Sequence, residues 1–264
     1  MIKTVLFSTD HAAASSLFNP NAYPSNLKEL VHSCIVRAGI LRFHVRNVAP
    51  YIEADRSELA NQIKSLWKEQ FKPFIESDDK ADAFVQFASL GYLSALDGVL
   101  ISLKSLLDVY ATIVSRSFVS SQALKFNRGN VKNIERKISG GRLIKWLRQS
   151  APKEDAEAAN IIADILTKHS KDWLTDAIAL RDRIVHDGEI RELKPVATTL
   201  RGFSDSGFNS QALSGPYMHN DSDVPSYCES ILTNTSIFLE ETIAHLPGIK
   251  MEFISLGVYG KIAH

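Results

Sequence analysis

Three side chains in the second half of the chain have the types and spacing needed for proton transfer beside an anion. They are Arg181, Asp182 and His186, within the segment 180–188. Histidine titrates near neutrality, so His186 can accept or donate a proton under physiological conditions. The planar guanidinium of Arg181 can bind two phosphate oxygens at once. Asp182 is suited to orient either Arg181 or a histidine.

The segment before these residues is typical of an amphipathic helix. Apolar residues recur three or four positions apart from residue 158 to residue 180, and Gly188 supplies a C-terminal stop. His186 then lies in the last turn, where the negative end of the helix dipole favours the imidazolium. Five helical residues turn through about 500°, which puts Arg181 and His186 about 140° apart. Their convergence needs either a distorted helix end or a two-fold related partner.

This combination resembles the HEPN superfamily, whose signature is an arginine, a polar residue, at least three further residues and a histidine. Arg181, Asp182 and His186 match these positions in turn. The resemblance implies a metal-independent endoribonuclease that needs no cofactor and cleaves single-stranded RNA through its 2′-hydroxyl. It also implies a homodimer in which two motifs meet at one cleft, with Arg181 and His186 catalytic and Asp182 orienting them. A stress, toxin or defence setting goes with that family.

The resemblance leaves a second interpretation open, a non-catalytic HEPN module that binds RNA or a protein partner. One subgroup of HEPN toxins carries a tyrosine two residues after the histidine, and a partner nucleotidyltransferase modifies it. This chain has Gly188 there. The departure puts control by such an antitoxin in doubt, although another antitoxin or regulatory protein stays a candidate partner.

Two further interpretations need no HEPN chemistry. In the first, Arg181 and Arg183 pair with Asp182 and Asp187 on a solvated surface, and His186 only ends a helix. The second starts from the His186-Asp187 dipeptide of HD-type metal phosphohydrolases, which also need an earlier histidine and a later aspartate. The sequence positions that would have to fill these roles are His169 and either Asp221 or Asp223. Their spacing fits poorly, and we expect no metal site.

A run of basic residues stands out in a chain whose formal net charge is zero. Between Lys125 and Arg148, Glu135 is the only acidic residue. The candidate RNA-binding residues are Arg128, Lys132, Arg136, Lys137, Arg142, Lys145 and Arg148. Such a concentration can hold a phosphate backbone, but an ordinary solvated helix face has the same composition.

Composition indicates an ordinary globular protein in a reducing compartment. Of the 264 residues, 45% are hydrophobic and 23% charged, which is enough to bury a sizeable core. The only cysteines, Cys34 and Cys228, fall in amphipathic segments and do not suggest a disulfide framework. The first ten residues lack a signal-peptide core, and Lys104 and Asp108 interrupt the best candidate membrane span. We therefore expect a cytoplasmic protein without a membrane segment.

The remaining pattern predicts a mainly α fold, an antiparallel bundle of about six helices. Apolar periodicity predicts helices over residues 25–50, 57–71, 81–118, 131–148, 154–186 and 225–246. Pro50 is expected to end the first of these helices. Residues 190–201 and 251–259 are candidates for a small β element near the C-terminus, and a polar loop is expected over 204–223.

The predicted domain organisation follows from these elements. Residues 1–80 form an N-terminal helical extension, residues 81–246 the HEPN-like bundle, and residues 247–264 a C-terminal strand or tail.

Overall fold

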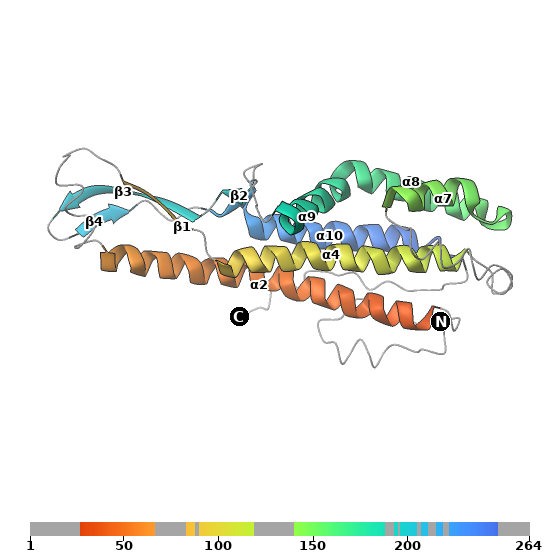
Figure 1. The fold of residues 1–264 in the computed structure, drawn as a ribbon, viewed down its shortest axis with the longest axis horizontal. Coiled ribbons are helices and arrows are strands. Elements are labelled where there is room, and N and C mark those ends of the chain that lie inside the picture. The colour runs from red at the N-terminus through yellow and green to blue at the C-terminus, as the bar shows by residue number, and fades with distance from the viewer. Residues whose placement is uncertain are drawn as a thin grey trace. The chain divides into compact units, whose positions relative to one another are not determined.

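The computed structural model confirms a mainly α-helical fold (Figure 1). The residues that the structure describes are 27–66, 83–87, 90–118, 140–187, 193–194, 196–204, 207–210, 215–218 and 222–247. They form two compact units, each assembled from segments far apart in the sequence. Unit 1 combines Met1–Phe43, Val99–Asp182 and Ser230–His264, and unit 2 combines His44–Gly98 and Arg183–Glu229. The predicted domain boundaries stay a prediction.

The described part of unit 1 is built from helices. It takes the beginning of α2 (Lys28–Leu66) and most of α4 (Leu90–Ser117), α9 (Thr175–Asp187) and α10 (Val224–Ile243). The helices α7 (Gly140–Ser150) and α8 (Ala156–His169) pack against each other and are joined by a 3-10 turn, η3 (Lys153–Asp155). A π-helical turn, labelled η4 (Ser170–Leu174), links α8 to α9.

The core of unit 1 is aliphatic with a few fixed rings. Fully buried side chains include Leu41, Leu100, Leu103, Leu106, Ile113, Ile162 and Phe238. The hydroxyl of Tyr110 on α4 hydrogen-bonds that of Thr242 on α10, inside this core. The rings of Phe118 and Trp146 meet edge to face at 6.4 Å and tie α4 to α7.

Unit 2 contains the β structure. Strand β1 (Ala83–Phe87) pairs antiparallel with β3 (Val196–Ser204), which also pairs with β4 (Gly207–Ser210). The register of the first pair runs from Ala83 opposite Leu200 to Phe87 opposite Val196. A separate antiparallel pair joins β2 (Leu193–Lys194) to β5 (Tyr217–Met218).

The predicted helix over 81–118 is wrong at its start, because Ala83–Phe87 is a strand and α4 begins only at Leu90. Phe84 and Phe87 are three residues apart and mimic a helical rhythm. A short apolar run of this kind is compatible with either structure, and pairing with β3 decides for the strand.

The predicted break at Pro50 is also wrong, since α2 continues through it to Leu66. The buried positions keep their helical spacing on both sides of the proline, at Val45, Val48 and Ile52. Burial of this face offsets the backbone hydrogen bond that a proline removes from a helix interior.

Strand character near residues 190–201 is confirmed by β2 and β3. The residues that pair with them lie in β1, β4 and β5, while the expected partner segment 251–259 lies outside the described residues. The polar loop expected over 204–223 instead contains β4 and β5.

Candidate functional site

Helix α9 carries all three residues of the predicted motif. Its buried positions are Ala177 and Leu180, which face the core of unit 1. Arg181 and Asp182 follow on the half-buried flank, and His186 is exposed in the last turn. The amphipathic pattern of the sequence therefore places the motif on the boundary between the packed face and solvent.

The structure joins Arg181 to Asp182. Nη1 of Arg181 donates to Oδ1 of Asp182 at 2.8 Å, with the two side chains 25% and 49% exposed. Nε of Arg181 is buried without a hydrogen-bond acceptor among the described residues. The carboxylate thus holds one end of the guanidinium. The same ion pair is expected if Arg181 and Asp182 only form a solvated surface pair, so it does not distinguish that interpretation from a catalytic motif.

His186 is not brought to Arg181 within α9. The helix is regular from Thr175 to Asp187, so the distorted helix end that would bring the two side chains together is absent. Along a regular helix they stay about 140° apart. Within α9 the structure therefore does not bring the two side chains together. The described residues provide no hydrogen-bond partner for His186.

A cavity of about 310 Å³ lies in unit 1, and Asp182 is part of its lining. Its walls come from α4, α7, α8, α9, α10 and the π-helical turn. The lining residues are Lys104, Leu107, Asp108, Tyr110, Ala111, Leu143, Leu166, Ser170, Leu174, Thr175, Ile178, Asp182 and Phe238. Asp182, which holds Arg181, therefore also borders a partly open, mostly apolar space. Sequence periodicity does not reveal this cavity, because its walls come from segments far apart along the chain.

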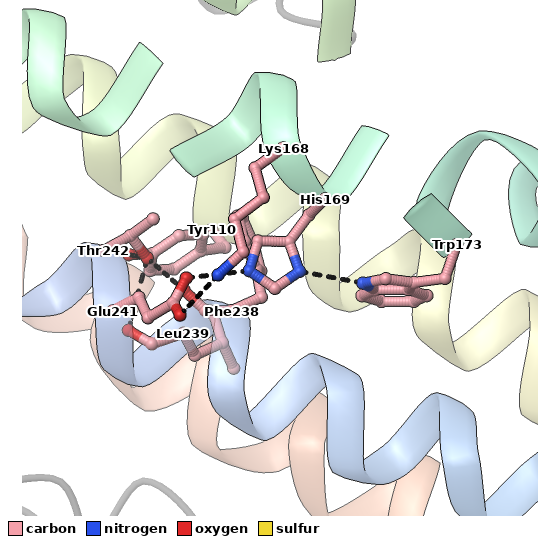
Figure 2. Close-up of polar contacts among 8 residues, drawn as sticks. All are labelled: Tyr110, Lys168, His169, Trp173, Phe238, Leu239, Glu241 and Thr242. Carbon is pink, nitrogen blue, oxygen red and sulfur yellow. Dashed lines mark hydrogen bonds and ion pairs between the residues drawn. The ribbon is translucent and has the colours of Figure 1, made fainter. Parts of the chain in front are cut away.

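A second polar cluster, around His169, was missed by sequence reasoning (Figure 2). Nε1 of Trp173 donates to Nδ1 of His169 at 2.9 Å, and Nε2 of His169 lies 2.9 Å from Oε2 of Glu241. An indole nitrogen only donates, so Nδ1 accepts and the ring proton is on Nε2, which donates to the carboxylate. The only local signal was the spacing of four between His169 and Trp173.

The same cluster binds α8 to α10 electrostatically. Lys168 donates to Oε1 of Glu241 at 2.9 Å, beside the contact from His169. Hydrogen bonds from Lys168 and then His169 lower the pKa of Glu241 below its ordinary value of 4.5. The ring of His169 is 4% exposed and packs on Phe238 at 5.4 Å. The cluster therefore ties α8 to α10 beside Phe238, which lines the cavity.

The predicted basic run is described only in part. Arg142, Lys145 and Arg148 are exposed on α7, three residues apart, and so share one face of the helix. Nη2 of Arg148 bonds Oδ1 of Asp164 on α8 at 2.7 Å, which neutralises part of that face. The other predicted members lie outside the described residues and are Arg128, Lys132, Arg136 and Lys137.

The described residues contain no candidate metal cluster and one helix that could cross a membrane by length and composition. No three His, Cys, Asp or Glu side chains gather as metal ligands in the described part of the chain. Asp223 bonds Ser226 at the start of α10, and Asp221 lies outside the described residues. Helix residues Gly91–Ser117 are long and apolar enough to span a membrane, but half of the apolar window is buried in the structure. Core helices of globular proteins meet the same criterion.

Comparisons with protein-family models, with curated proteins and with solved structures find no match. The HEPN resemblance therefore rests on the α9 motif and its helical surroundings alone.

Proposed function

We propose that this protein is a metal-independent endoribonuclease of the HEPN type, active on single-stranded RNA as a cytoplasmic homodimer. One observation carries the proposal: a regular α9 holds an Arg181–Asp182 pair at 2.8 Å and exposes His186 on a different side of the same helix. A two-fold axis beside α9 would bring Arg181 of one copy to His186 of the partner subunit. The dimer supplies the convergence that one helix cannot.

The chemistry needs no group beyond these side chains. His186 accepts the proton of the 2′-hydroxyl as the 2′-oxygen attacks phosphorus. The same imidazole, now protonated, gives that proton to the 5′-oxygen as the bond between phosphorus and the 5′-oxygen breaks. Arg181 stabilises the additional negative charge on the phosphoryl oxygens, and Asp182 keeps the guanidinium in place. The products are a 2′,3′-cyclic phosphate and a 5′-hydroxyl.

Further support comes from α7, which presents three cations on one face. We propose that Arg142 and Lys145 contact the RNA backbone, while Arg148 contributes less because it is paired with Asp164.

The test is incubation of the purified chain with a mixed RNA pool in EDTA. We expect the wild type to cleave and leave 2′,3′-cyclic phosphate ends. His186→Ala should lower the rate by about 10²–10⁴-fold, and Arg181→Ala by about 10²–10³-fold. Arg183→Ala is the matched control, because it removes an exposed arginine from the same helix, and it should stay within about twofold of wild type.

The second candidate is a non-catalytic HEPN module that binds RNA or a protein partner. The Arg181–Asp182 ion pair favours it, because a guanidinium already paired with a carboxylate presents less charge to a phosphate. This interpretation is supported if the folded, dimeric wild type binds RNA but cleaves none of the pool. His186→Ala should then bind RNA as well as the wild type does.

A further inference from the structure

The cavity in unit 1 has the size of a site for one small ring system. Its volume of about 310 Å³ is at the lower end of the roughly 300–1,000 Å³ that small-molecule sites occupy. It is bounded on one side by the π-helical turn Ser170–Leu174. Such turns are frequent at functional sites because they displace side chains from the regular helical positions.

The walls suit a flat ring. Tyr110 and Phe238 both line the cavity and meet edge to face, with ring centroids 5.7 Å apart and planes at 79°. The hydroxyl of Tyr110 is held by Thr242, which fixes that ring. Leu107, Ala111 and Ile178 add aliphatic surface. A bound ring would therefore contact aromatic and aliphatic side chains.

Polar groups stand on the same lining. Lys104 and Asp108, one turn apart on α4, form an ion pair, and Asp182 adds a second carboxylate from α9. The lining therefore offers carboxylate acceptors beside one ammonium donor. The edge of a nucleobase presents the complementary groups, N–H donors next to a carbonyl or ring-nitrogen acceptor.

We propose that this cavity binds one nucleobase. The inference rests on the proposed function where it identifies that base as part of the RNA substrate. Asp182 touches both the cavity and Arg181, so a base held in the cavity would carry its own phosphate toward the guanidinium. The cavity would then choose which nucleotide is presented to the motif.

Binding is tested with the full chain and the four free nucleosides, using calorimetry and saturation-transfer NMR, with ribose as the probe that lacks a base. We expect at least one nucleoside to bind with a dissociation constant on the order of 1 mM, and ribose not to bind. Ala111→Leu and Ile178→Phe fill the cavity and should weaken binding about tenfold or more. Ile101→Phe is the matched control, because Ile101 is an exposed α4 residue outside the lining.

Circular dichroism and thermal melting establish that each variant is folded. If a variant does not fold, binding is located directly in the wild type. The measurement is intermolecular NOEs between the base protons and the methyl groups of Leu143, Leu174 and Ile178. The proposal is overturned if no nucleoside binds, if filling the cavity leaves binding unchanged, or if decanoate occupies the cavity and nucleosides do not.

A second readout separates this proposal from the nuclease itself. If the wild type cleaves RNA, filling the cavity should raise KM about tenfold for RNA that carries the preferred base at the cleavage site. KM for RNA with an abasic position there should not change. An unchanged base preference would contradict base binding in the cavity and leave the proposed nuclease activity standing. If a nucleoside binds but RNA is not cut, the proposed nuclease activity is contradicted and base binding in the cavity is supported. If RNA competes with the bound nucleoside, the base belongs to the RNA substrate. If RNA does not compete, the ligand of the cavity is a free nucleotide.

Discussion

At the scale of single residues, Glu241 is the acceptor on which the His169 cluster depends. It takes hydrogen bonds from Lys168 and His169, both at 2.9 Å, and these join α8 to α10. The ring of His169 is buried, so a missing acceptor would leave its Nε2–H unpaired in the core of unit 1. Glu241 therefore matters more to stability than a partly exposed carboxylate usually does.

We predict a pH dependence of stability from this carboxylate. Its pKa is lowered in the folded state, so its contribution is fully present above the ordinary pKa of 4.5 and is lost as pH falls through the folded value. Glu241→Gln should cost about 1 kcal/mol at pH 7 and progressively less as pH falls from 4.5 through the folded pKa, because protonation removes the same interaction from the wild type. Urea unfolding of both proteins across this range measures the difference.

The matched control for that experiment is Glu240→Gln, which changes the neighbouring exposed carboxylate on α10. Equal pH profiles for wild type and Glu241→Gln would show that the cluster does not couple folding to protonation.

At the scale of elements, α2 and α4 approach each other closely at one point in unit 2. A Cβ added to Gly98 of α4 would lie 2.3 Å from Nδ1 and 2.8 Å from Cγ of His44 on α2. Because Cγ is near the base of that side chain, the imidazole cannot simply swing away. Gly98 is needed for packing, whereas Gly39 on α2 has nothing within 4 Å of the same position.

We predict opposite effects for the two glycine substitutions. Gly98→Ala should destabilise the fold by about 1–3 kcal/mol through overpacking, reduced in part by the better helix propensity of alanine. Gly39→Ala should stabilise it by about 0.5–1 kcal/mol, since only the helix propensity changes. The denaturant midpoints of the two variants, compared with that of the wild type, measure both effects. A Gly98→Ala protein as stable as Gly39→Ala would mean that the helices can separate at no cost.

At the scale of the whole molecule, the regular α9 makes the dimer a requirement of the proposed chemistry. Arg181 and His186 of one copy lie on different sides of the helix, so each composite site must take one residue from each subunit. A dimer of one Arg181→Ala chain and one His186→Ala chain therefore keeps both residues of one composite site.

We predict that Arg181→Ala and His186→Ala complement each other when co-expressed with different affinity tags. Random pairing makes about half of the dimers mixed, each with one of two sites intact, so the mixture should recover about a quarter of wild-type activity. Doubly tagged dimers purified away from the homodimers should recover about half. Mixed dimers as inactive as the separate variants would place both residues of a site in one chain.

Much of the architecture was accessible from the sequence because helix formation depends on near neighbours. The three-to-four spacing of apolar residues located α8, α9 and α10, and it put Arg181 and His186 at a helix end on opposite flanks. That spacing also indicated that one helix could not bring the two together. These are local properties, fixed by 3.6 residues per turn.

The tertiary structure decided what depends on distant partners. Ala83–Phe87 became a strand because residues 196–200 pair with it, and α2 continued through Pro50 because packing outweighs one lost hydrogen bond. His169 meets a carboxylate 72 residues away, and six elements contribute to the lining of the cavity beside Asp182. Local periodicity contains no information on such contacts, since they form only when separate faces are buried together.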